Sequence, residues 1–186
     1  MGKLIYIANV SVDGYIEDAQ GNFDWTDPSD ELFVFITELV RPAGTYVYGR
    51  RMYETMAVWE TQPALAAESE LMADFATMWQ AADKIVYSTT LDAVSTAKTR
   101  LEPRFDPDSM RDIKASAARD LTLGGPTLAN HAFNAGLVDE SHLFVHPVTL
   151  GAGKRALPSD ARMELELLDE RRFDNGVVYL SYRTTI

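Results

Sequence analysis

The chain has 186 residues, of which 46% are hydrophobic and 24% charged, as expected for one globular domain with a substantial core. Its net charge of −11, with the acids dispersed along the chain, argues against nucleic-acid binding, which needs a basic surface. It has no cysteine, which excludes disulfides and thiolate metal sites, and neither a signal-peptide pattern nor a membrane-length apolar run, so we expect a cytoplasmic protein.

The first half of the chain alternates strand patterns with helical ones. Residues 3–10 form a short apolar run typical of a strand, and 11–25 contain Asp-Gly and Gly-Asn turn signals that predict a long loop. A helix is expected over 27–40, with Asp27 as its cap. The pattern then predicts a strand at 45–49, a helix at 50–56, a helix at 66–83 and a strand at 84–88.

The second half continues this alternation and then ends in two strands. The pattern predicts a helix at 104–120, a strand at 120–125, a helix at 126–137 and a strand at 142–150. Residues 163–173 and 177–186 are expected to form a hairpin that turns at Asp174-Asn175-Gly176. Together these elements predict a single α/β domain over 1–186, with a mainly parallel central sheet and an antiparallel C-terminal hairpin.

Three of the expected strands end in residues that suit an anion. Ligands of open α/β sheets bind beyond the carboxyl ends of the strands, where glycine, free helical N–H groups, hydroxyls and guanidinium can contact phosphate. Three such ends at successive strands indicate a ligand that contains a diphosphate. Plainer interpretations stay open: the glycines form a tight turn, and the arginines are a solvated pair bonded to Glu54. The three ends are Gly49-Arg50-Arg51, Ser88-Thr89-Thr90 and Gly124-Gly125-Pro126-Thr127.

Five segments, taken in order, resemble the dihydrofolate reductase superfamily. They are SVDG, YGRRMYETM, VYSTT, LGGPTLANHAFNAGLVDE and LVDESHLFVHPVTLGAGKRAL. The set is most similar to the C-terminal reductase domain of the riboflavin-biosynthesis deaminase-reductase and to its stand-alone relatives. The resemblance covers nearly the whole chain and implies a three-layer fold, an oxidoreductase activity with NADPH as cofactor, and a homodimer.

The resemblance also implies roles for individual residues. Gly49, Arg50, Arg51 and Met52 would hold the cofactor phosphates, Ser88 and Thr89 would lie near the adenosine 2′-phosphate, Gly124, Gly125, Pro126, Thr127 and Leu128 would wrap the diphosphate, and Ala8 and Asn9 would face the nicotinamide. A cis peptide would join the two glycines. The chain departs from the family pattern at Met52, where dihydrofolate reductases usually have threonine, and at Leu123, where the riboflavin branch usually has an acid.

The expected reaction is hydride transfer to a small pyrimidine- or pterin-like heterocycle, of which 5-amino-6-(5-phosphoribosylamino)uracil is one form. The departures at Met52 and Leu123 motivate an alternative, in which the fold is kept as a non-catalytic nucleotide-binding module. A third interpretation is a hydrolase or transferase that uses the same anion site. Binding of NADPH with and without its oxidation would separate the first two.

Reduction also needs a proton donor and a substrate pocket. Asp30 lies five residues after Trp25, a spacing that resembles the substrate-binding acid of dihydrofolate reductases, and Asp13 of SVDG borders the substrate site in the riboflavin branch. Each acid could instead be structural, as a first-turn helix residue or a turn residue. Phe23, Trp25 and Trp59 are candidates to contact a flat substrate. His142 and His146 are four apart on an expected strand without a third ligand, so no metal site is expected.

Overall fold

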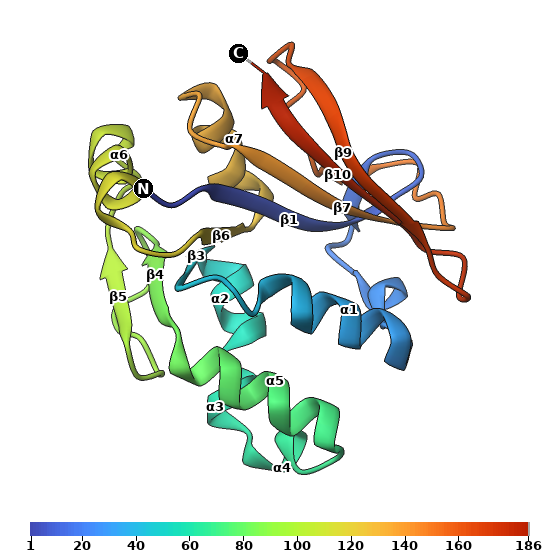
Figure 1. The fold of residues 1–186 in the computed structure, drawn as a ribbon, viewed down its shortest axis with the longest axis horizontal. Coiled ribbons are helices and arrows are strands. Elements are labelled where there is room, and N and C mark those ends of the chain that lie inside the picture. Colours follow the sequence, from blue (N-terminus) through green and yellow to red (C-terminus); the bar gives the residue numbers. More distant parts are fainter. Residues whose placement is uncertain (186) are drawn as a thin grey trace.

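A computed structural model describes residues 1–185 and contains one eight-stranded sheet, which runs from β5 at the left of Figure 1 to β9 and β10 at the right. The sheet order is β5-β4-β3-β6-β1-β7-β10-β9, in which the first six strands are parallel and the last two are antiparallel to their neighbours. The predicted fold class is therefore confirmed. The strands are β1 (Leu4–Ser11), β3 (Thr45–Gly49), β4 (Asp83–Tyr87), β5 (Thr99–Glu102), β6 (Leu121–Gly124), β7 (Glu140–His146), β9 (Glu164–Arg172) and β10 (Val178–Thr185).

Helices cover both faces of the sheet, which gives three layers. The α6 and α7 helices pack on one face, while α1, α2 and α5 pack on the other, which lies below the sheet in Figure 1. Among residues 1–185, none of the helices is long and apolar enough to cross a membrane. The helices are α1 (Asp30–Val40), α2 (Arg50–Met56), α3 (Val58–Thr61), α4 (Pro63–Ala66), α5 (Glu70–Ala81), α6 (Pro107–Ser116) and α7 (Pro126–Asn134).

Alternation along the strands explains how the two faces are filled. In β3, Tyr46 and Tyr48 point to the α1–α5 side, and Val47 between them packs with the α6–α7 side. In β6, Leu121 and Leu123 belong to the α6–α7 core, so Thr122 lies on the α1–α5 side. The polar residue in the middle of this apolar strand therefore faces the same side as the two tyrosines.

Several predicted helix boundaries were wrong because other residues form the caps. The first helix begins at Asp30, since Ser29 Oγ accepts the N–H of Leu32, and Asp27 lies before the cap. The fifth helix is capped by Ser69 and starts at Glu70, four residues later than predicted. The helix predicted over 104–120 covers only Pro107–Ser116, because Asp106 caps it and Ala117 is extended.

Three short strands were not predicted. β2 (Tyr15–Asp18) lies within the segment 11–25 that we expected to be a loop, and it pairs with β8 (Gly153–Arg155) in a separate two-stranded sheet. The third, β5, is the edge strand beside β4. The predicted C-terminal hairpin is present, and Gly176 makes its turn with φ +85°.

Candidate active site

The carboxyl ends of three neighbouring parallel strands meet at one cavity. β4, β3 and β6 lie side by side in register, so Gly49, Ser88 and Gly124 follow one another along the same edge of the sheet. The predicted convergence of the three ends is confirmed. All thirteen residues expected to contact the cofactor line this cavity, whose volume is about 1160 Å³. A single small ligand usually occupies roughly 300–1,000 Å³, so there is room for a second one.

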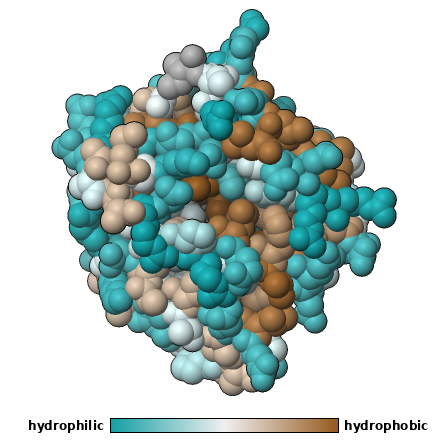
Figure 2. All heavy atoms as spheres, viewed as in Figure 1, coloured by the Kyte–Doolittle hydropathy of each residue, from teal (hydrophilic) through white to brown (hydrophobic). Residues whose placement is uncertain are grey.

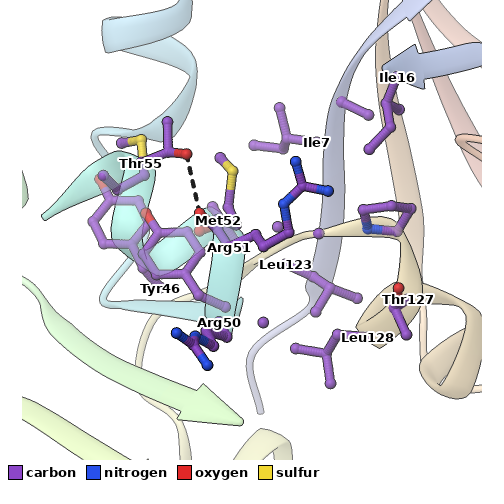
Figure 3. A pocket seen from close by; sticks show the side chains of 18 of the residues that line it. Ile7, Ile16, Tyr46, Arg50, Arg51, Met52, Thr55, Leu123, Thr127 and Leu128 are labelled. Carbon is purple, nitrogen blue, oxygen red and sulfur yellow. Dashed lines mark hydrogen bonds between the residues drawn. The ribbon is translucent and has the colours of Figure 1, made fainter. Parts of the chain in front are cut away.

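Figure 2 shows hydrophobic residues gathered in a hollow near the centre of the molecule, surrounded by hydrophilic ones. The close view shows how side chains from separate elements approach this space (Figure 3). Tyr46 and Met52 of β3 and α2 lie on one side, and Ile7 and Leu123 of β1 and β6 lie on the other. The cavity is thus lined by the sheet strands, by α1, α2 and α5, and by the first half of α7.

Two arginines at the start of α2 provide positive charge at the cavity. Arg50 bonds to Glu54 at 2.8 Å and donates to the Thr90 hydroxyl at 2.8 Å, which links two of the strand ends. Arg51 bonds to Glu17 of β2 at 2.9 Å. The Arg50–Glu54 pair is exposed on both sides, and exposed ion pairs contribute only about 0–1 kcal/mol, so an incoming anion can replace Glu54 at small cost. Arg51 is exposed but Glu17 is largely buried, and Lys154 lies 3.7 Å from the same carboxylate and can pair with it when Arg51 binds an anion.

The Gly124–Gly125 turn leaves its backbone accessible. Gly125 caps α7 without a side-chain hydrogen bond and has φ +101°, so the first N–H groups of this helix stay free for an anion. No peptide bond in residues 1–185 is cis, so the expected cis bond is absent, and the left-handed Gly125 makes the turn instead. Carbon at the Cβ position of Gly125 would approach the Gly49 backbone nitrogen to 3.6 Å. Glycine therefore keeps the gap between two strand ends open.

The end of β4 is joined by residues that the sequence did not single out. The Ser88 hydroxyl accepts the N–H groups of Thr90 and Leu91, which fixes the turn after the strand. Arg104 and Phe105, which follow the unpredicted β5, also line the cavity, and Phe105 stacks with His131 of α7 at 6.4 Å between ring centroids. This end of the cavity combines a cation with two flat rings.

At the end of β1, Asn9 is held in place by a buried histidine. His146 Nε2 lies 2.9 Å from Asn9 Oδ1, and Trp25 packs edge-on against the imidazole at 5.3 Å. Burial lowers the pKa of His146, which favours the neutral ring. With its oxygen fixed by the histidine N–H, Asn9 can present its amide N–H₂ group to the cavity. His142 bonds instead to Glu140 and Tyr179, away from His146.

The predicted substrate residues are divided between the cavity and its surroundings. Phe23 and Trp59 line the cavity, whereas Trp25 lies behind Asn9 and His146 and is not among the lining residues. Asp30 is exposed on the first turn of α1 and also lies outside the lining. The same helix turns Phe33 and Ile36 toward the cavity. The geometry therefore gives no support to Asp30 as the proton donor.

Asp13 organises a loop rather than lining the cavity. Its carboxylate accepts hydrogen bonds from the Ser11 hydroxyl at 2.6 Å and from the N–H groups of Leu150 and Gly151 at 3.1 and 2.7 Å. These bonds, with that from Ser11 the largest, lower the pKa of Asp13 to about 2. A carboxyl group with this pKa is ionised at neutral pH, which does not favour a role as general acid.

A model of the RibD C-terminal domain matches residues 2–179. The chain belongs to this family. The uncharacterised protein YyaP of Bacillus subtilis strain 168 is 27% identical to this chain over 182 residues, which cover 97% of this chain and 94% of YyaP. The expected riboflavin-reductase branch is thus confirmed.

Solved structures show the same fold at lower identity. A putative riboflavin biosynthesis protein from Shewanella sp. PV-4 superposes with a TM-score of 0.73 at 18% identity and 99% coverage of both chains. Dihydrofolate reductase from Enterococcus faecalis, solved with NADP(H), gives a TM-score of 0.61 at 13% identity and covers 100% of this chain and 98% of its own. The RibD C-terminal domain in this chain therefore has the dihydrofolate reductase-like fold.

Proposed function

We propose that this protein is an NADPH-dependent reductase that transfers a hydride to a small heterocycle. One observation carries the proposal: the ends of β3, β4 and β6 line a single cavity with Arg50, Arg51 and free helical N–H groups on it. That arrangement suits a long, doubly phosphorylated ligand better than a compact anion, because its donors are spread along three adjacent strands.

The residues present fit such a cofactor. Gly125 keeps the backbone between two strand ends open, and α7 offers N–H groups that no side chain caps. Arg50 and Thr90 are already bonded to each other at the end where a 2′-phosphate would bind. Asn9 offers an amide group at the end of β1, where the resemblance implies the nicotinamide. NADPH bound there would supply the hydride.

The proton for the reduced group comes from solvent in this proposal. The carboxylates among the described lining residues are Glu17 and Glu54, and both are paired with arginines. Neither predicted acid lies on the cavity. A water molecule that enters the hollow seen in Figure 2 can protonate a nitrogen or oxygen once the hydride has been added.

Thermal unfolding with NADPH and with NADH tests the proposal. A ligand present at 100 times its Kd stabilises the folded state by about 2.7 kcal/mol. For 186 residues the entropy of unfolding is roughly 0.39 kcal/mol per kelvin, so Tm should rise by about 7 °C with NADPH. Oxidation of NADPH at 340 nm with pterins, pyrimidines and quinones then separates a reductase from a binding module. Absence of any Tm shift would contradict the proposal.

Association into a homodimer stays a prediction. Strand β9 is a sheet edge that is exposed along its whole length and presents Leu165, Leu167 and Leu168, of which Leu167 is 51% exposed. Charged residues make up the rest of this edge, but the three exposed leucines on this edge strand suit contact with a second copy. Light scattering during size-exclusion chromatography measures it: twice the chain mass supports a dimer, and the mass of one chain contradicts it.

A further inference from the structure

One part of the cavity is apolar and lies between the sheet and helices α1 and α5. Its walls come from α1, α2, α3 and α5, and three of the aromatic rings pack against each other with centroids 4.7–6.0 Å apart. We call this part the apolar arm. Its walls are Phe33, Ile36, Val40, Met56, Trp59 and Phe75.

Two hydroxyl groups on the sheet side of the apolar arm have no hydrogen-bond partner. Tyr46 of β3 and Thr122 of β6 both line the cavity and lie side by side in register on the same face of two neighbouring strands. They are only 3% and 6% exposed, and neither Tyr46 Oη nor Thr122 Oγ1 is bonded to any described residue. A buried hydroxyl without a partner costs free energy, so two adjacent ones on a cavity wall indicate a polar group on a ligand.

The hydroxyls are both able to donate. Burial raises the pKa of Tyr46 to about 12, so the phenol keeps its proton at neutral pH. By contrast, Tyr48 is stacked parallel to Tyr46 at 5.9 Å between centroids, and its own hydroxyl accepts the Trp79 Nε1–H at 3.0 Å. The neighbouring tyrosine is therefore satisfied within the protein, and Tyr46 is not.

Positive charge is confined to other parts of the cavity. The basic residues among its described lining are Arg50 and Arg51 at the start of α2, Arg104 after β5, Lys154 of β8 and the nearby His131 of α7. The walls of the apolar arm have no charged side chain. Arg41 and Arg119 lie near enough to Tyr46 to oppose the effect of burial on its pKa, but neither lines the cavity. A phosphate taken into this arm would therefore lose its hydration without direct contact to a cation, which is unfavourable.

We propose that the apolar arm binds the substrate and that this substrate is an uncharged, planar heteroaromatic compound rather than a sugar phosphate. Its flat body packs against Phe33, Trp59 and Phe75, and a carbonyl or ring nitrogen at its edge bonds to Tyr46 and Thr122. This inference rests on the proposed reductase function for its chemistry: the hydride adds to the carbon of a C=N bond, and the nitrogen takes a proton from water. It differs from the phosphoribosyl substrate that the family resemblance implied.

Isothermal titration with two probes tests the substrate class. Quinoxalin-2(1H)-one is a neutral planar heterocycle with a carbonyl group and a reducible C=N bond, and uridine 5′-phosphate carries a pyrimidine on a phosphorylated ribose. We expect the quinoxalinone to bind at least about tenfold more tightly than the nucleotide when saturating NADP⁺ occupies the phosphate-binding end of the cavity, because only the nucleotide then has a charge to desolvate in the apolar arm. Equal binding, or tighter binding of uridine 5′-phosphate, would overturn the inference.

Removal of each hydroxyl tests the contact itself. Tyr46→Phe and Thr122→Val should each raise the Kd of quinoxalin-2(1H)-one by about 3- to 10-fold, the range for one lost hydrogen bond. The same changes should leave Tm of the free protein equal or higher, because they remove an unpaired buried group. A purely structural hydroxyl would give the opposite result, namely a lower Tm with the probe Kd unchanged, and that outcome would refute the assignment.

Tyr48→Phe is the matched control for stability. It removes a tyrosine hydroxyl that accepts a hydrogen bond from Trp79, so Tm of the free protein should fall by about 3–8 °C. NADPH titrations of the Tyr46→Phe protein separate this inference from the proposed function. If NADPH binds but neither substitution changes the Kd of quinoxalin-2(1H)-one, the substrate inference fails and the reductase proposal stands. If NADPH does not bind but both substitutions raise the Kd of the quinoxalinone, the binding site inferred here stands and the reductase proposal fails.

Discussion

Replacement of Gly125 by alanine perturbs the cavity at the turn between β6 and α7. The φ angle of +101° at this residue is one that side chains other than glycine rarely adopt. The added methyl group would lie 3.6 Å from the Gly49 nitrogen and 3.7 Å from the Met52 Cβ atom. These are ordinary contact distances, so the strain comes from the backbone angle and the methyl group fills space between two strand ends.

The structure gives two separate magnitudes for this substitution. A residue held in a sparsely populated backbone region costs about 1–3 kcal/mol, so Gly125→Ala should lower Tm by about 3–8 °C in a chain of 186 residues. The methyl group should also obstruct the approach of a phosphate to the N–H groups of α7. We expect a rise in the Kd for NADPH of about tenfold or more, which corresponds to the roughly 1.5–3 kcal/mol of one charge-assisted hydrogen bond.

Thermal unfolding and NADPH titration of the purified variant measure the two effects. Gly151→Ala is the matched control, because Gly151 has φ +74° and no atom within 4 Å of the added carbon. It should lower Tm to a similar degree and leave the Kd for NADPH unchanged. If Gly125→Ala destabilises the protein but binds NADPH as tightly as the wild type does, the diphosphate does not lie at this turn.

Three other substitutions test individual side chains. Arg50→Gln should raise the Kd for NADPH about tenfold, with a weaker salt dependence of binding, because a charge-assisted contact is lost; an unchanged salt dependence would contradict a phosphate contact. Asp13→Asn should flatten the fall in Tm between about pH 4 and pH 2. Because the pKa of Asp13 is lowered in the folded state, its carboxylate contributes its full stabilisation above about pH 4 and loses it as the pH falls toward 2. If Tm of Asp13→Asn falls with pH as steeply as Tm of the wild type does, this assignment is refuted. Asp30→Asn should leave kcat nearly unchanged. Loss of a general acid lowers rates by about 10²–10⁴-fold, so a fall in kcat of that size would show that Asp30 is the proton donor after all.

The elements around the cavity were the most predictable part of the chain. Residues 45–49 and 50–56 are β3 and α2 as expected, because a run of β-branched and aromatic residues ends at a glycine and helix-forming residues follow. The position of the cavity also followed from the sequence, since the carboxyl ends of parallel strands share one edge of the sheet. Local sequence patterns are therefore sufficient to predict regular strands and helices and the sheet edge at which the strands end.

Features that depend on distant partners could not be predicted in the same way. β2 and β8 are four and three residues long and pair with each other across more than 130 positions of sequence, so neither has a clear strand pattern alone. The role of Asp30 depends on the rotation of α1 about its axis, which the spacing from Trp25 does not determine. Thr122 gave a signal that was missed, namely one hydroxyl within the apolar strand LTLG.

A crystal structure with NADPH tests the central claim most directly. We predict that the diphosphate lies between Arg50 and the Gly124–Gly125 turn, that the adenosine lies beside Ser88 and Arg104, and that the nicotinamide lies at Asn9. The apolar arm should stay free for the substrate. NADPH bound at another surface, or a diphosphate that contacts none of the three strand ends, would contradict the account.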